Sequence, residues 1–317
     1  MFTIRERFNW SRLRDDRAWG PKASVPGRTH FVVPTTAYDA DYTVAMAGSW
    51  AREYNGLVYD SFKLAHDACV DGRGDAIVFL PGTHTVATAS IAMNKTGVKL
   101  YGPEAWMGRQ VHKPSATLTT NIAADEIANV TAPDIGLYGL TIRPITAGVG
   151  IDLSAVAANF HAVGCHLDLY TPAVNVATVG LKALGAATGV VIENCYALSD
   201  GAQGNAIDAT ALLDSAIRGC VIVNNAGTWA SAVLTGAATQ GLLIEHCRFD
   251  CTGTAMTVGI NGTGATIARG VFVRYCDFGN LVTVPVDNYD ANECQLVECY
   301  KAGVGATDGG TKIVAIT

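Results

Sequence analysis

The chain has 317 residues, of which 49% are hydrophobic and 16% charged, with 34 glycines and a net charge of −6. This is enough apolar material for a large core, and so few charges predict that much of the outside is covered by other subunits. No apolar run reaches 18 residues and arginines interrupt the start of the chain, which excludes a signal peptide and a membrane-spanning helix.

Residues 1–56 form the first expected unit, an irregular N-terminal arm. Residues 1–34 carry a net charge of +4, so the rest of the chain carries −10. We expect this basic arm to dock on an acidic surface, and its anchors are the aromatic and basic residues that interfaces favour: Phe8, Trp10, Arg12, Arg14, Arg17 and Trp19. The alternative that the arm folds back onto its own domain stays open.

Residues 57–96 are expected to cap the next unit. Phe62, Ala65 and Cys69 stand at helical spacing in residues 60–70, with Asp60 or Ser61 as the N-cap. Short strands are expected at 76–80, 83–86 and 89–91. A helix and entry strands of this kind would close the open end of a repeat protein.

Residues 97–317 contain a repeat. The pattern is clearest in residues 189–197 and returns in residues 242–249 and 271–278. Aligning its copies superposes Leu140, Cys165, Cys195, Cys220, Cys247, Cys276 and Cys299, at successive spacings of 25, 30, 25, 27, 29 and 23 residues. Repeats of this length indicate a solenoid. With short apolar strands, turn residues between them and no strong helix, the prediction is an all-β, single-stranded, right-handed parallel β-helix of about seven coils.

The repeat also predicts two columns of side chains. Cys165, Cys195, Cys220, Cys247, Cys276 and Cys299 would point inward as a structural column of free thiols, in keeping with assembly in a reducing cytoplasm. Two residues before each turn-flanking cysteine, Glu193, Arg218, Glu245 and Arg274 would form an outward column of alternating charge. We interpret this column as mutual ion pairing, because each acid has an arginine neighbour, and catalysis by these acids is the disfavoured alternative.

The run from the expected helix through Gly74-Asp-Ala-Ile-Val-Phe-Leu-Pro-Gly82 to Gly97-Val-Lys-Leu-Tyr-Gly102 resembles the entry into the pectate-lyase-like β-helix of phage tailspikes and related virion proteins. The later Cys-containing coils resemble that superfamily too. The resemblance covers residues 57–317 and implies fold more strongly than activity, since this fold carries lyases, hydrolases, adhesins and inert proteins. It is strongest to small virion proteins that decorate heads or tails as trimers.

Other motifs are assigned no role. Arg73-Gly-Asp75 spells an adhesion tripeptide but precedes a buried strand. Asp287, Asp290 and Glu293 could hold calcium or a sugar, but a solvated loop is the favoured interpretation. No cysteine or histidine spacing indicates a metal site, and the outward positions that follow the turn contain no acid cluster. We therefore expect no cofactor, no metal and no catalytic residue.

The function predicted from the sequence is a non-enzymatic structural protein of a phage virion, assembled in the host cytoplasm. It would be a homotrimeric decoration or head spike that contacts capsid or other virion proteins through residues 1–56, and would bind neither nucleic acid nor membrane. The alternative is a tailspike or tail-fibre adhesin that binds or cleaves host surface polysaccharide, with Tyr138, Tyr196, Tyr275 and Tyr300 as stacking residues. A self-assembling bacterial surface or scaffold protein is the third hypothesis.

Overall fold

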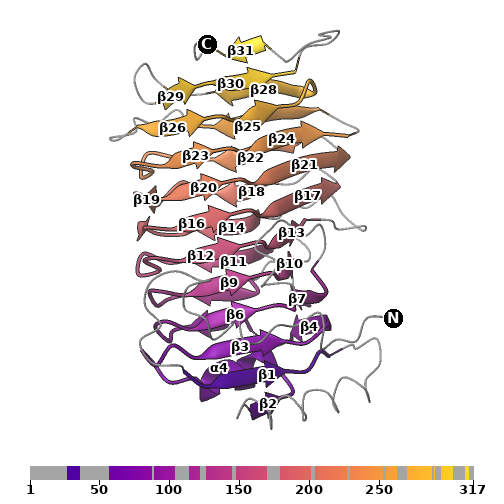
Figure 1. Ribbon diagram of the computed structural model, residues 1–317, viewed down its shortest axis with the longest axis vertical. Helices are drawn as coiled ribbons and strands as arrows, with labels where there is room; N and C mark the ends of the chain where they lie inside the picture. Colours follow the sequence, from indigo (N-terminus) through magenta and orange to yellow (C-terminus); the bar gives the residue numbers. More distant parts are fainter. Residues whose placement is uncertain are drawn as a thin grey trace.

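A computed structural model of the chain describes residues 27–35, 57–87, 89–103, 114–121, 126–144, 148–169, 179–200, 204–226, 229–252, 255–262, 270–287, 289, 294–302 and 311–313. These residues form a tall stack of coils that rises from the N-terminal to the C-terminal end of the molecule (Figure 1). The prediction of a parallel β-helix is confirmed.

Three parallel sheets run the length of the stack. Sheet A contains, in spatial order, β2 (Leu57–Tyr59), β1 (Thr29–Val32), β3 (Ala76–Phe79), β6 (Lys99–Tyr101), β9 (Gly136–Tyr138), β12 (His161–Val163), β16 (Val191–Glu193), β20 (Ala216–Arg218), β23 (Leu243–Glu245), β26 (Val271–Arg274) and β29 (Cys294–Val297). Sheet B contains β4 (Gly82–Val86), β7 (Ala116–Thr120), β10 (Thr141–Arg143), β13 (His166–Asp168), β17 (Tyr196–Asp200), β21 (Val221–Ala226), β24 (Arg248–Cys251), β27 (Asp277–Phe278), β30 (Cys299–Lys301) and β31 (Thr311–Ile313). Sheet C contains β5 (Ile91–Met93), β8 (Ala128–Val130), β11 (Val149–Leu153), β14 (Val179–Ala183), β18 (Asn205–Asp208), β22 (Trp229–Leu234), β25 (Met256–Asn261) and β28 (Val282–Asp287).

Each coil takes one strand from each sheet in the order A, B, C. Eight such coils are complete, from β3–β4–β5 to β26–β27–β28, one more than predicted. The difference arises because the strands expected only as an entry, β3 to β5, pair in register with β6 to β8 and close a coil of their own. A small extra ladder joins β15 (Ala187–Thr188) to β19 (Leu212–Leu213), and β31 pairs antiparallel with β30 at the C-terminal end.

A single left-handed residue turns the chain from sheet A to sheet B in every coil from β9–β10 onward. The residues at this bend are Gly139, Gly164, Asn194, Gly219, His246, Tyr275 and Glu298, and their φ angles lie between 48° and 61°. One residue is sufficient for this bend because a left-handed backbone conformation changes the direction of the chain sharply at a single position. At Gly219 a Cβ atom would lie 2.6 Å from Oδ1 of Asn194 in the coil below, so a larger residue there would require the Asn194 side chain to move.

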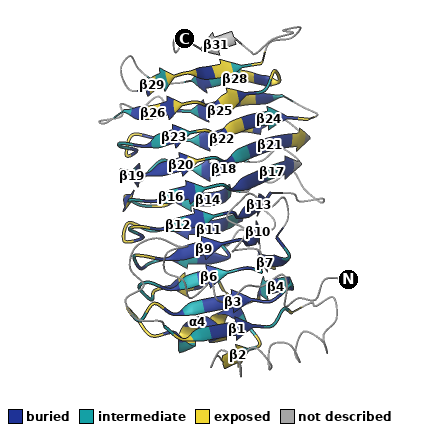
Figure 2. Ribbon diagram, viewed as in Figure 1, coloured by how far each residue is buried: buried dark blue, intermediate teal, exposed yellow. Residues whose placement is uncertain are grey.

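The bend places one cysteine per coil in the core. Cys165, Cys195, Cys220, Cys247, Cys276 and Cys299 are all buried and all free thiols. Each thiol lies close to a carbonyl of the preceding coil, as in the 3.6 Å contact from Cys247 Sγ to Ile217 O. Leucine, isoleucine, valine, alanine and phenylalanine fill most of the rest of the interior, and Figure 2 shows the strands of the central coils largely buried.

A short helix covers the N-terminal end, as predicted. Helix α4 (Phe62–Ala68) begins at Ser61, whose side-chain oxygen accepts a hydrogen bond from the Leu64 amide, and its Phe62 ring packs edge-on against Phe79 at 5.2 Å. Strand β1 was not predicted. It lies within residues 1–56, the expected irregular arm, and pairs in parallel with β2 and β3 as part of sheet A.

Candidate functional site

The outward face of sheet C carries a column of mostly polar side chains. The strand register aligns Ala92, Asn129, Asp152, Lys182, Asp208, Leu234, Asn261 and Asp287, of which only Ala92 and Leu234 are apolar. Their strand neighbours, such as Ile151 and Leu153 on either side of Asp152, are core residues, so the column points away from the core. We call Asp152, Lys182 and Asp208 the sheet C triad.

The triad places a lysine between two carboxylates on three consecutive coils. Neighbouring parallel strands lie about 4.8 Å apart, so the Cα atoms of Asp152 and Asp208 are separated by roughly 10 Å with Lys182 between them. Asp152 is 5% exposed. One oxygen of Asp208, Oδ1, accepts hydrogen bonds from the Thr210 amide at 3.1 Å and the Thr210 hydroxyl at 2.7 Å, which fixes the carboxylate. The triad therefore combines acids and a base on adjacent coils of one outer face, the arrangement that the sequence analysis did not find.

A second polar group lies on the outward face of sheet B. Arg143 donates from Nε (2.9 Å) and Nη2 (2.5 Å) to Oδ2 of Asp168 on the next strand. His166 precedes Asp168 by two residues on the same face, and its ring lies 5.3 Å from that of Tyr196. Although they face outward, Asp168 and His166 are only 5% and 3% exposed. This group is therefore shielded from solvent, and burial raises the pKa of Tyr196.

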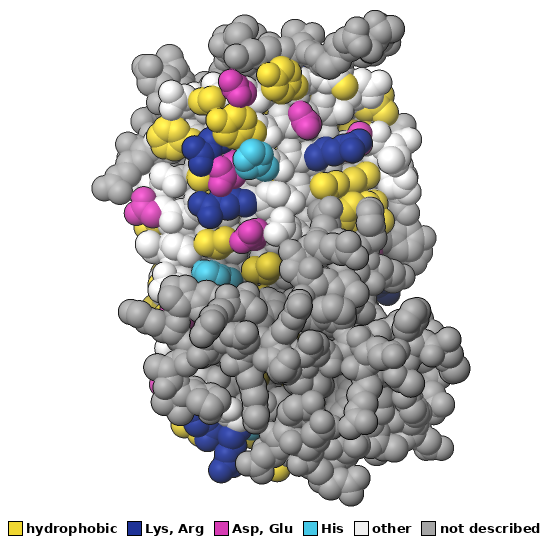
Figure 3. Space-filling view, viewed as in Figure 1, with side chains coloured by type: hydrophobic (Ala, Val, Ile, Leu, Met, Phe, Trp, Pro, Cys, Tyr) yellow, Lys and Arg dark blue, Asp and Glu magenta, His cyan; other side chains and the backbone are white. Residues whose placement is uncertain are grey.

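The predicted charge column lies on the outward face of sheet A in the expected register. Strand pairing aligns Glu193, Arg218, Glu245 and Arg274 on consecutive coils. Glu245 accepts from Arg218 Nε at 2.8 Å on one oxygen and from Arg274 at 2.7 Å on the other. Both arginines are 45% exposed, so each pair contributes at most about 1 kcal/mol. Figure 3 shows the alternating basic and acidic side chains in the C-terminal half of the molecule.

The four candidate stacking tyrosines divide into two groups. Tyr138 and Tyr196 are 7% and 9% exposed, so they cannot offer an open ring to a sugar, and burial raises the pKa of Tyr138 to about 12. Tyr275 and Tyr300 are 43% and 40% exposed. Tyr275 stacks on His246 of the preceding coil with centroids 5.0 Å apart and an interplanar angle of 15°.

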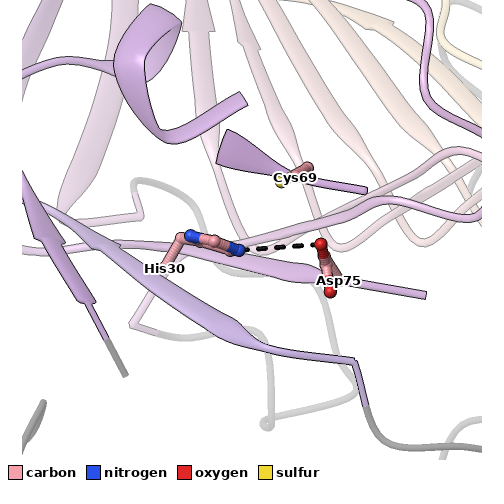
Figure 4. Close-up of side chains that lie close together, drawn as sticks. All are labelled: His30, Cys69 and Asp75. Atoms are coloured by element: carbon pink, nitrogen blue, oxygen red, sulfur yellow. Dashed lines mark ion pairs between the residues drawn. The ribbon is translucent and has the colours of Figure 1, made fainter. Parts of the chain in front are cut away.

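Three buried side chains meet at the N-terminal end, where Figure 4 shows His30 of β1 and Asp75 before β3 facing each other near Cys69. Their ligand atoms lie within 4.8 Å of one another, and His30 Nε2 is 3.6 Å from Asp75 Oδ2. The sequence analysis missed this cluster because His30 lies in the expected arm. Asp75 also ends the Arg73-Gly-Asp75 tripeptide and is 0% exposed, so that tripeptide cannot be presented to a receptor.

The cluster does not fit a metal ion. Asp75 Oδ1 accepts from the Arg28 amide (2.7 Å) and Arg73 Nε (2.6 Å), and Oδ2 from the Val70 amide (2.8 Å) and Arg73 Nη2 (2.6 Å). These bonds occupy the lone pairs that a metal would need. Burial raises the pKa of Cys69 to about 12, which opposes formation of the thiolate ligand. Burial alone would raise the pKa of Asp75, but the hydrogen bonds from Arg73 and the two amides outweigh it and lower that pKa. We interpret the cluster as a structural lock.

The predicted docking residues of the arm, Phe8, Trp10, Arg12, Arg14, Arg17 and Trp19, lie outside the described residues, as do Asp290 and Glu293 of the acidic loop. No helix in the described part of the chain is long and apolar enough to cross a membrane.

No protein-family model and no curated protein matches this sequence. Solved structures do. A pectin methylesterase from Aspergillus niger aligns with a TM-score of 0.56 and 16% identity over 93% of this chain and 92% of its own. The pectin methylesterase from Erwinia chrysanthemi gives 0.56 and 10% over 93% and 94%, and a rhamnogalacturonan lyase gives 0.59 and 12% over 87% and 74%. The likeness is one of fold. It shows that the chain shares the parallel β-helix fold of these proteins.

Proposed function

We propose that this protein binds polysaccharide along the outward face of sheet C, with Lys182 and Asp208, the two partly exposed members of the sheet C triad, at the centre of the contact. The observation that carries the proposal is the placement of Asp152, Lys182 and Asp208 on three consecutive coils of one outer face. The structural neighbours named as acting on pectin and rhamnogalacturonan support it, because they show that this fold is used on extended glycans.

The chemistry of the column suits a sugar chain. A hydroxyl group both donates and accepts hydrogen bonds, and the column offers carboxylate acceptors, an ammonium donor and the amides of Asn129 and Asn261. Asp208 binds Thr210 through Oδ1 alone, which leaves Oδ2 for a ligand. The coils repeat every 4.8 Å or so, so a polysaccharide lying along the stack meets new polar groups at each step.

The binding test uses the full chain, immobilised polysaccharides that include polygalacturonate and rhamnogalacturonan, and affinity electrophoresis. We expect Lys182→Gln and Asp208→Asn to weaken retention at least ~10-fold, since each removes a charged hydrogen-bonding partner. Arg218→Gln, an equally polar change on sheet A, is the control and should retain the wild-type affinity. Absence of retention on every glycan would overturn the proposal.

A separate assay decides whether binding leads to cleavage. Hydrolysis of a glycosidic bond commonly uses two carboxyl groups that flank the bond, so the loss of Asp208 tests for it. Release of reducing ends that Asp208→Asn abolishes would identify a hydrolase, and unsaturated products would identify a lyase. Binding without either product would identify an adhesin.

The role as a structural virion protein remains a prediction from the sequence. It rests on the resemblance to decoration proteins and on the basic, aromatic composition of residues 1–56. Retention of the purified chain on capsids, lost when residues 1–26 are removed, would support it.

A further inference from the structure

We propose that the outward face of sheet A is a contact surface for a second copy of this chain, related by a two-fold axis that runs parallel to the strands. Such an axis reverses the order of the coils in the second copy. A residue near the start of a strand in one copy therefore still faces a residue near the start of a strand in the other. The contact is therefore isologous, and each column of side chains meets its own reverse.

The first column is complementary to its own reverse. In coil order it contains Val163, Glu193, Arg218, Glu245, Arg274 and Val297. Reversal sets valine against valine at the two ends, Glu193 against Arg274, and Arg218 against Glu245. All four charged contacts then join opposite signs, and Arg218 and Arg274, each 45% exposed, can reach across the interface.

The second outward column of the same sheet has the same property. It contains His161, Val191, Ala216, Leu243, Phe272 and Gln295. Reversal sets His161 against Gln295, Val191 against Phe272, and Ala216 against Leu243. Polar residues thus meet polar ones, and each smaller apolar side chain meets a larger one. Phe272, which is 46% exposed on its own, gains an apolar neighbour.

Both columns require the same axis. From β12 to β29 each column is complementary about the point between β20 and β23. Because β29 is the last strand of sheet A, the residues below β12 that continue the columns, Tyr138 and Gly136, face no strand of the second copy in this arrangement. Two independent patterns therefore agree on one arrangement. By contrast, a threefold axis that brought this face against itself in register would set Glu193 against Glu193 and Arg274 against Arg274, which is unfavourable.

The size of the surface indicates a weak association. Six coils of about 4.8 Å and three residues of about 3.3 Å give a flat area of roughly 290 Å² per copy. A standard stable interface buries about 800 Å² per partner, so this contact belongs with transient complexes unless flanking residues enlarge it. We expect a dimer that dissociates on dilution and weakens with salt.

The test is sedimentation velocity of the full chain over a concentration series. Glu193→Arg and Arg274→Glu each create two like-charge contacts per dimer and should raise the dissociation constant at least ~10-fold. The double variant restores opposite signs across the axis and should recover most of the loss. Arg248→Glu, a charge reversal of a 64% exposed arginine on sheet B, should leave the dissociation constant unchanged.

Several outcomes would overturn the proposal. These are a monomer at all concentrations up to ~1 mM, a dimer that neither single reversal weakens, or a double variant no better than the singles. Thermal melts of each variant accompany the measurement, because the reversals also place like charges on neighbouring coils of one chain. A variant that dissociates but melts as wild type isolates the effect on association.

Discussion

Removal of the Asp75 carboxylate is expected to unfold the N-terminal end of the β-helix before the rest. This side chain is 0% exposed and joins three segments: the Arg28 amide before β1, the Val70 amide after helix α4, and Arg73 before β3. Asp75→Ala deletes the acceptor for all of them at once, so the amides of Arg28 and Val70 lose their partner.

The magnitude follows from the groups left without a partner. The two amides belong to the exposed residues Arg28 and Val70, so each costs about 1 kcal/mol when it loses its acceptor, at the lower end of the range for such groups, and the two together cost about 2 kcal/mol. Arg73 is 28% exposed, so water can solvate its charge when the carboxylate is removed. Asp75→Asn keeps the shape and one acceptor oxygen and should lose less.

Urea unfolding followed by hydrogen exchange measures the effect and its location. We expect the free energy of unfolding of Asp75→Ala to fall by about 2 kcal/mol or more, with faster exchange in β1 and helix α4 than in β20 to β26. Lys63→Ala, which removes an exposed ion pair with Asp67, is the control and should change stability by less than ~0.5 kcal/mol. Stability within 1 kcal/mol of wild type for Asp75→Ala would refute the interpretation of the cluster as a lock.

Two further predictions concern single positions. Burial lowers the pKa of His66 to about 4. The neutral imidazole therefore makes its full contribution to stability above pH 6.5, and that contribution is lost as the pH falls to 4. In urea titrations at a series of pH values, His66→Leu should remove about 3 kcal/mol of this loss of stability in acid. An unchanged pH slope would contradict this. Glu298 has a φ of 48°, which costs a side-chain-bearing residue about 1–2 kcal/mol, so Glu298→Gly should raise the melting temperature although glycine is more flexible when unfolded. Glu298→Ala keeps the Cβ atom and should give no gain.

The sequence was sufficient to predict sheets A and B in the later coils because one residue marks the bend between them. The inward cysteine follows that residue directly, and in four consecutive coils a charged residue stands two positions before the cysteine, as Glu245 does before Cys247. A strand alternates its faces with a period of two, so counting from the bend gives the direction of each side chain. Arg143 and Asp168 lie four positions after the bend residues Gly139 and Gly164, on the outward face, whereas the sequence prediction extended only to the second position after the bend.

The N-terminal end could not be predicted in the same way. Strand β1 has four residues and pairs with β3, whose partner residues lie 47 positions later in the chain. Its buried residues Phe31 and Val32 belong to no repeat, and a pairing over such a distance leaves no local pattern. The cluster of His30, Cys69 and Asp75 depends on that pairing, so it became visible only with the strand in place.

The sheet C triad could not be predicted from the sequence, although the side-chain columns of sheet A and of the core could. Asp152 lies 12 residues after Leu140, whereas Lys182 lies 17 residues after Cys165, because the segment between sheets B and C differs in length from coil to coil. Loops tolerate such differences while the strands must keep their register. No fixed offset from the bend therefore identifies the residues of sheet C, and Asp152, Lys182 and Asp208 are brought together only by the pairing of β11, β14 and β18. The variable segments can change length without moving the triad, which suits a face that binds a ligand better than one whose role is to hold the coils together.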